Sequence, residues 1–283
     1  MRTIPILLAA LLLAGCFGAS DETTTTTSTT TSSPAPLPAF TLPNSATGCY
    51  EAIGVLLVDM AVAQASLPAN WTAADAQAAL QTPQPTGKGA IWFNGYTCTN
   101  STMANGRAEG AEFGVLVKAP RLSENSTTPP ALLNIYQIFQ ASNVPAVHSA
   151  LGLVDFPTRE ANVTVTSNSG GASPGFASIL VGNATRTLYS FDYSAFLPST
   201  FTGTADFWHE VPEGMGQFHF EIADRAILQG AISTCNFPDP AVQKVTGVPS
   251  CGPTTQAFVV VIPDQEWQSE FRWNPGMHAV ASS

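Results

Sequence analysis

The segment Glu266–Trp273 reads EWQSEFRW, and its alternation decides the fold class of this chain. Trp267, Phe271 and Trp273 fall on one side of an extended backbone, and mostly polar residues fall on the other. A period of two residues is typical of a β-strand with one buried and one solvated face. The stretch Gly216–Ile222 repeats the pattern, so both segments predict half-buried antiparallel strands.

Further apolar or alternating segments, separated by turn residues, extend this pattern along the chain. Glu51–Val58 is an apolar run, and we expect further strands over Ala90–Tyr96, Glu112–Lys118, Leu132–Gln140, Ala161–Thr166, Ala177–Val181, Thr187–Asp192, Ala205–Val211, Ala226–Thr234 and Gln256–Ile262. Short helices are expected over Asp59–Ser66, over Ala73–Leu80 with Thr72 as N-cap, and over Asn143–Gly152 with Asn143 as N-cap. About eleven short strands and few helices predict a single, mainly β domain (α+β), either an antiparallel β-barrel or a sandwich.

The N-terminus carries an export signal. Arg2 precedes an apolar stretch, Ile4–Leu13, and the sequence Leu13-Ala14-Gly15-Cys16 ends it. This ending resembles the lipobox of prokaryotic lipoproteins, bacterial or archaeal. The resemblance implies that residues 1–16 form a signal peptide and that Cys16 is lipidated, anchoring the protein to the outer face of the cell membrane. The apolar stretch is too short for a membrane span, which takes about 20 residues.

The alternative is a plain secretory signal cleaved a few residues later. In either case a low-complexity segment, residues 17–38, follows: Thr23–Thr31 is almost pure threonine, and prolines continue to Pro38. Such a segment cannot bury apolar surface, so we expect a disordered stalk. The β-rich extracytoplasmic domain is then expected over residues 39–283.

The charge of the chain excludes nucleic acid as a partner. The net charge is −10, and only 10 of 283 residues are lysine or arginine, so no basic patch for nucleic acid can form. Membrane lipid, through Cys16, and a small ligand remain as expected partners. No Walker loop, no G-x-G-x-x-G and no H-E-x-x-H motif occurs, so the sequence predicts no cofactor. The sequence does not indicate the oligomeric state of the protein.

Apart from Cys16, the chain has the cysteines Cys49, Cys98, Cys235 and Cys251. An even number in an exported chain predicts two disulfides, for which three connectivities exist. Proximity favours Cys235–Cys251, and Cys49–Cys98 then follows by elimination. A zinc site is the alternative, but the C-x-x-C spacing that it usually needs is absent.

Glycosylation is expected at N-x-[ST] sequons in exposed loops or strand ends. The sequons begin at Asn70, Asn100, Asn125, Asn162 and Asn183.

The segment Trp208–His219 holds the densest set of ligand-type side chains. A hairpin in its middle would set His209 opposite His219, and Glu210 or Glu221 would then complete a metal site. A change of one residue in register would put the two histidines on opposite faces and leave a plain hairpin.

The stretch Gly171–Gly175 matches the G-x-S-x-G pattern of serine hydrolases around Ser173. That chemistry needs a strand before the serine, a helix after it and a backbone N–H behind it. Pro174 lacks the N–H, so we interpret the stretch as a loop.

Three pairs of stretches carry a further likeness: Val55–Asp59 with Leu67–Trp71, Gly89–Tyr96 with Glu112–Val117, and Leu132–Gln140 with Leu151–Leu153. Together they resemble the β-barrel domain of the acetoacetate decarboxylase-like superfamily. The family's chemistry needs a lysine of lowered pKa that forms a Schiff base beside a second cation. Lys118, at the end of a predicted strand, is the candidate here, but no lysine of this chain neighbours another. The resemblance therefore implies a barrel without the decarboxylase activity.

Three functions fit these features. The first is a lipid-anchored binding or surface module whose barrel holds a small apolar or amphipathic ligand. The second is an extracytoplasmic enzyme that uses Lys118 or the facing histidines, and the third is a structural envelope protein without a ligand. A hollow barrel would favour the first. The side chains expected to line it are Phe218, Phe220, Trp267, Phe271 and Trp273.

Overall fold

The computed structural model describes residues 37–80, 84–123, 131–167, 177–252 and 257–280, and all of them belong to one compact unit. Strands dominate this unit, as the sequence predicts, with a few short helices between them.

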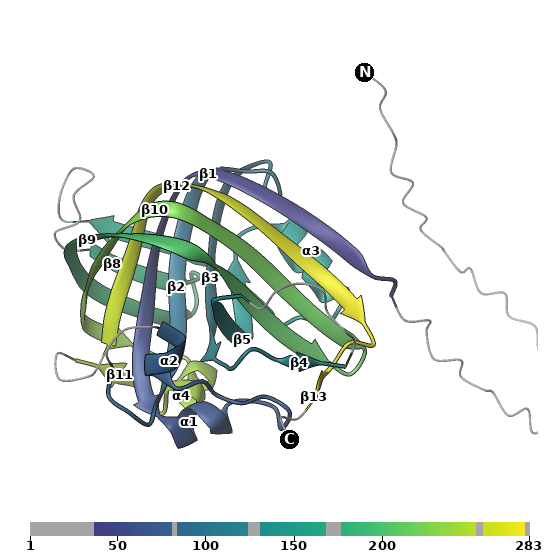
Figure 1. The fold of residues 1–283 in the computed structure, drawn as a ribbon. Helices are drawn as coiled ribbons and strands as arrows, with labels where there is room; N and C mark the ends of the chain where they lie inside the picture. The colour runs from purple at the N-terminus through teal and green to yellow at the C-terminus, as the bar shows by residue number, and fades with distance from the viewer. Residues whose placement is uncertain (1–36, 81–83, 124–130, 168–176, 253–256, 281–283) are drawn as a thin grey trace, which may run out of the picture. The chain divides into compact units, whose positions relative to one another are not determined.

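Within the described residues, seven strands close into a barrel. In order around the ring they are β10 (Gly214–Asn236), β12 (Ala257–Pro275), β1 (Phe40–Asp59), β2 (Lys88–Ser101), β3 (Gly106–Leu116), β5 (Leu133–Ser142) and β9 (Thr187–Val211). The ring closes because β9 also pairs with β10. Neighbouring strands are antiparallel except for β5 and β9, which run parallel. Figure 1 shows β1, β12, β10 and β9 side by side as long, curved strands.

The strand β1 shows why the sequence of a barrel strand reads as an apolar run. Ile53 and Val55 belong to the core inside the barrel, whereas Ala52 and Leu56 belong to a second core. Both faces are therefore buried, and the period of two is lost along much of the strand.

The second core lies between the barrel and an outer layer of strands. This layer consists of β7 (Asn162–Ser167), β8 (Ala177–Gly182) and the first half of β9. Phe93 of β2 packs edge-on against Phe191 of β9, with ring centroids 5.1 Å apart. Gly95 allows the close approach, because a Cβ there would lie 2.6 Å from a methyl group of Ile179.

The remaining elements are short. The helices are α1 (Met60–Ala65), α2 (Ala76–Leu80), α3 (Pro145–Gly152) and α4 (Pro240–Thr246); β6 (Thr158–Glu160) pairs with β5, β11 (Ser250–Cys251) with β10, and β4 (Arg121–Leu122) with β13 (Ala279–Val280). In Figure 1, α1, α2 and α4 gather near one end of the barrel. No helix in the described ranges combines the length and the apolar character needed to cross a bilayer.

Three pairs of predicted strands are each one continuous strand. The predicted breaks fall within β9, β10 and β12, where turn-forming residues are accommodated as irregularities of the ladder. Pro198 lies within β9 opposite Leu228, and the register between β9 and β10 shifts between Ile222 and Arg225. A bulge of this kind bends a strand without ending it.

The predicted N-caps of two helices were wrong. α2 begins after Asp75, whose Oδ1 accepts hydrogen bonds from the backbone N–H of Gln77 (3.0 Å) and Ala78 (3.3 Å), rather than after Thr72. α3 begins at Pro145, a residue that suits the first helical position because it needs no N–H partner. Asn143 instead accepts a hydrogen bond from Glu109 N at 3.0 Å.

Both predicted disulfides are present. Cys49–Cys98 joins β1 to β2, and Cys235–Cys251 joins β10 to β11. In each case the two cysteines lie directly opposite each other in the ladder. All four cysteines are thus used, which excludes the alternative zinc site.

Candidate binding site

The barrel is hollow. Its interior holds a cavity of about 760 Å³, and all seven barrel strands contribute side chains to the wall. Along β1 the wall is formed by every second residue from Leu57 to Glu51, as the alternation of a strand requires. Ala79 and Leu80 of α2 line the same cavity. A volume of this size falls within the range of about 300–1,000 Å³ that is usual for small-molecule sites.

Four aromatic side chains form a continuous part of the wall. The rings of Trp92 and Phe207 lie 5.9 Å apart, those of Phe207 and Phe220 5.4 Å, and those of Phe220 and Trp267 6.2 Å, all in edge-on contact. We call these four residues the aromatic wall. Each residue lines the cavity, and each comes from a strand whose alternate residues point into the barrel.

Two carboxyl groups interrupt this apolar lining. Glu51 of β1 and Glu112 of β3 line the cavity and are 8% and 3% exposed. Asn94 of β2, two residues from Trp92 on the same side of the strand, connects them. Its amide donates to Glu51 Oε1 at 2.5 Å and to a carboxylate oxygen of Glu112, and its Oδ1 accepts from Glu112 N at 2.5 Å. We call Glu51 and Glu112 the carboxyl pair.

The surroundings of the carboxyl pair disfavour negative charge. Burial, and next the neighbouring Glu51 carboxylate, raise the pKa of Glu112 to about 8 against the opposing effect of the hydrogen bond from Asn94. Burial and then the Glu112 charge also raise the pKa of Tyr96 and Tyr189 well above the usual range. Glu112 is therefore largely protonated at neutral pH.

The cavity is open to solvent at one region of its wall. Pro85, Thr200 and Gln229 line the cavity and are exposed. Phe220 and Trp267 lie elsewhere on the wall and separate the cavity from a second space of about 40 Å³, since they line both.

The aromatic residues predicted to line the barrel divide into two groups. Phe220 and Trp267 line the large cavity, and Phe218 lines the small space. Phe271 and Trp273 point into the barrel as predicted, but they are packed core residues: Phe271 contacts Phe218, with ring centroids 4.8 Å apart.

Lys118 lies outside the cavity. It follows β3, its backbone N–H donates to Thr72 O at 2.9 Å, and its side chain is exposed. The chain has two further lysines: Lys88 pairs with Asp59 at 2.6 Å, and Lys244 is exposed on α4.

The predicted facing of His209 and His219 was wrong. The hairpin turns between Val211 and Gly214, so that His209 pairs with Gly216 and His219 pairs with Asp206. Residues 206 and 209 point to opposite faces, and the two histidines do so as well. The described part of the chain contains no cluster of three or more histidine, cysteine or acidic side chains that would hold a metal ion.

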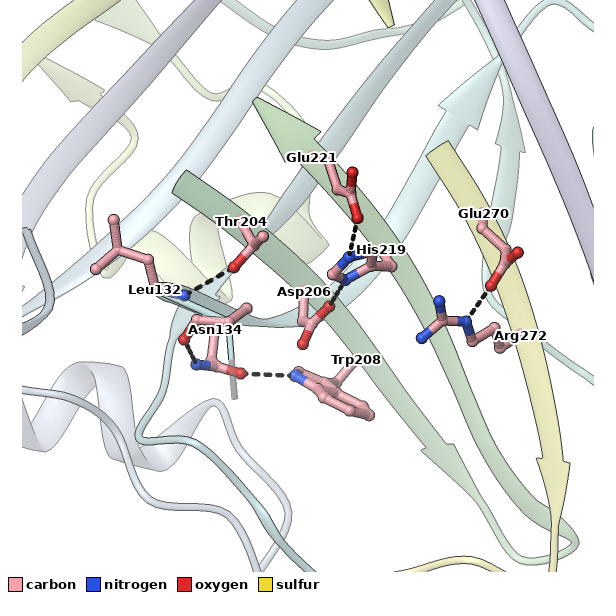
Figure 2. Close-up of polar contacts among 10 residues, drawn as sticks. Leu132, Asn134, Thr204, Asp206, Trp208, His219, Glu221, Glu270 and Arg272 are labelled. Atoms are coloured by element: carbon pink, nitrogen blue, oxygen red, sulfur yellow. Dashed lines mark hydrogen bonds and ion pairs between the residues drawn. The ribbon is translucent and has the colours of Figure 1, made fainter. Parts of the chain in front are cut away.

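Each of the two histidines has polar partners of its own. Nδ1 of His219 is bonded to Asp206 Oδ1 at 2.7 Å, and Nε2 lies 3.7 Å from Glu221 (Figure 2). Figure 2 also shows Arg272 paired with Glu270 on the neighbouring strand β12. His209 is bonded through Nδ1 to Gln137 O at 3.0 Å, and burial lowers its pKa.

The predicted glycosylation sites are exposed wherever the structure describes them. These are Asn70, Asn100, Asn162 and Asn183. Asn125, Cys16, residues 17–36 of the stalk and the Ser173 motif lie outside the described residues, so glycosylation and lipidation remain predictions.

The sequence analysis missed the carboxyl pair and Asn94. Each is a polar residue within or at the start of an apolar predicted strand, and that isolation was the available signal. The pairing of Ala90–Tyr96 with Glu112–Lys118 was predictable, but nothing in the sequence places Glu51 of β1 beside Asn94 and Glu112 of this pair.

Comparison with known proteins identifies the fold. The chain matches no protein-family model and no curated protein. Among solved structures, an acetoacetate decarboxylase-like enzyme from Sphingomonas wittichii RW1 is 12% identical, with a TM-score of 0.50 over 85% of this chain and 92% of that one. The enduracididine biosynthesis enzyme MppR, solved in complex with pyruvate, is 11% identical, with a TM-score of 0.51 over 86% and 90%.

An acetoacetate decarboxylase is 10% identical, with a TM-score of 0.50 over 84% of this chain and 89% of that one. Identities this low show the fold alone. The chain has the acetoacetate decarboxylase-like fold, which confirms the fold that the resemblance in the sequence implies.

Proposed function

We propose that this protein binds a small, largely apolar or amphipathic ligand inside its barrel. The observation that carries the proposal is the cavity of about 760 Å³, whose wall is mainly aliphatic and aromatic. Burial of a ligand's apolar surface there supplies affinity at about 25 cal/mol per Å², and the few polar groups orient the ligand.

The lysine positions favour binding over Schiff-base chemistry. The structures that share the fold include enzymes, but one fold hosts many functions. A Schiff base needs a lysine amine at the substrate, and no lysine is found among the described residues that line the cavity. We therefore do not propose the decarboxylase reaction for this chain.

A cavity-filling variant tests the proposal. Ala205 lines the cavity and is 4% exposed, so the ring introduced by Ala205→Phe would occupy ligand space. We expect the unmodified protein to bind the neutral fluorophore N-phenyl-1-naphthylamine and Ala205→Phe to bind it at least about tenfold more weakly. Leu197→Phe, at a position that is 68% exposed, is the matched control and should bind like the unmodified protein. Failure of the folded, unmodified protein to bind any apolar probe would contradict the proposal.

We further propose that the protein is exported and held at the outer face of the cell membrane by a lipid on Cys16. The lipobox-like sequence supports this placement, as do the two disulfides, which persist in oxidising compartments. We expect Cys16→Ser to abolish incorporation of labelled acyl chains and to release the protein from membranes. Ser20→Ala should change neither property. Unchanged membrane association of Cys16→Ser would overturn the anchor.

A further inference from the structure

We infer that the ligand of the barrel is a single unbranched alkyl or acyl chain, and that Phe220 and Trp267 set the longest chain that fits. This inference rests on the proposed binding function. It names the shape of the ligand and the residues that select it.

The cavity is elongated along the strands. On β1 its wall runs through alternate residues from Leu57 to Glu51, and on the neighbouring β12 it runs from Ala257 to Ile262. At a rise of about 3.3 Å per residue, the lined stretch of β1 is about 20 Å long. An unbranched chain contacts such a wall along its whole length. A compact ligand would leave part of the wall without contacts and lose that packing energy.

The small space of about 40 Å³ continues the cavity toward one end of the barrel. On β1 the cavity is lined as far as Glu51, and Ala46 lines the small space. On β2 the order of residue numbers is reversed: Trp92 lines the cavity, and Cys98 lines the small space. Antiparallel neighbours show this reversal when both lead to the same end of the barrel. The two spaces therefore follow one another along the barrel.

Phe220 and Trp267 form the partition between the two spaces, since each of them lines both. Their rings meet edge-on, with centroids 6.2 Å apart. Phe207 of β9 packs edge-on against Phe220 at 5.4 Å, and Tyr96 of β2 packs edge-on against Trp267 at 4.6 Å. Rings that pack tightly against several strands resist displacement. A chain that lies along the cavity ends at this partition.

The partition predicts selection by chain length. Each methylene group that enters the cavity raises the affinity about fourfold. Once the chain reaches the partition, further carbons remain in water at the open side of the cavity and add nothing. In a homologous series the affinity therefore rises and then levels off.

A series of 1-alkanols, from octanol through decanol, dodecanol and tetradecanol to hexadecanol, tests the inference. Displacement of N-phenyl-1-naphthylamine from the folded protein measures each affinity. The head group is uncharged, so the charge of the carboxyl pair does not enter the comparison. We expect the affinity of the unmodified protein to level off within this series.

Variants of the partition locate the limit. Phe220→Ala removes a ring that separates the two spaces, so we expect the affinity to level off at least one alkanol later in the series. Phe220→Leu removes fewer atoms and should shift the limit in the same direction if Phe220→Ala does not fold. Phe201→Ala is the matched control: Phe201 is half-buried like Phe220 and lines the cavity, but it is not among the described residues that line the small space. It should leave the limit unchanged.

The outcomes separate this inference from the binding function. The inference is wrong if the alkanols bind without levelling off, if the partition variants keep the original limit, or if Phe201→Ala shifts the limit as far as Phe220→Ala. In each of these cases alkanol binding itself still supports a ligand in the barrel. If neither the fluorophore nor any alkanol binds the folded, unmodified protein, the proposed function fails and the inference fails with it.

Discussion

At the scale of single residues, the unusual feature of this protein is a polar group in the middle of an apolar interior. Glu112 is held by Asn94 through both its carboxylate and its backbone N–H. Tyr189 donates to the backbone oxygen of Asn94 at 2.6 Å, so the group is fixed from a third strand. Carboxyl groups of strongly perturbed pKa are enriched at functional sites, which makes Glu112 a candidate ligand-binding group.

The raised pKa of Glu112 predicts how stability depends on pH. The folded state keeps a proton that the unfolded chain releases near pH 4.5, so stability falls as pH rises from about 4.5 to about 8. We expect Glu112→Gln, which is neutral at every pH, to remove this loss. Between pH 5 and pH 9 the unmodified protein should lose on the order of 3–5 kcal/mol more than the variant. Urea unfolding at several pH values measures the difference, and parallel pH profiles would contradict it.

At the scale of elements, α4 shows how one buried carboxylate can organise a segment. Asp239 is 1% exposed, caps α4 by accepting from Ala241 N at 2.8 Å, and pairs with Arg159 at 2.9 Å and with Arg186 at 2.5 Å. Lys88 and Asp59 form an ion pair of similar length at the surface, where the aspartate side chain is 76% exposed. The two aspartates differ in burial and in their number of partners.

This difference predicts unequal costs for the same substitution. Asp239→Ala removes a cap worth about 1 kcal/mol and two ion pairs whose arginine side chains are 28% and 55% exposed, so we expect a loss of about 2 kcal/mol. Asp59→Ala should lower the stability much less, because water screens its ion pair. Chemical denaturation of the two variants provides the comparison. Equal losses of stability would show that burial does not determine how much these aspartates stabilise the protein.

The elements also show what could be read from the sequence. Trp267, Phe271 and Trp273 were placed correctly on one buried face, because the period of two is a local property. α4 was missed although Asp239, Pro240 and Gly247 are strong local signals for its ends. The lengths of β9, β10 and β12 were underestimated, because whether Pro198 ends or bends a strand depends on the strand paired with it.

At the scale of the whole molecule, closure of the barrel determines the site. The carboxyl pair and the aromatic wall come from β1, β2 and β3 on one side and from β9, β10 and β12 on the other, two groups of strands that lie far apart along the chain. Which residues of a strand point into the barrel was partly predictable from the alternation along the sequence. The order of the strands around the ring was not. The parallel contact between β5 and β9 is a long-range pairing that no local pattern indicates.

The two disulfides close loops of different length, so their removal should lower the stability of the protein by different amounts. Cys49–Cys98 spans 49 residues and ties together two barrel strands, whereas Cys235–Cys251 spans 16 residues around α4. If each disulfide acts by restricting the unfolded chain, the first contributes about 4 kcal/mol and the second about 3 kcal/mol. We expect the double variant Cys49→Ala/Cys98→Ala to be less stable than Cys235→Ala/Cys251→Ala in urea unfolding. Reduction of the unmodified protein should cost more than either variant. The reverse order of the two variants would show that local packing around α4 outweighs loop length.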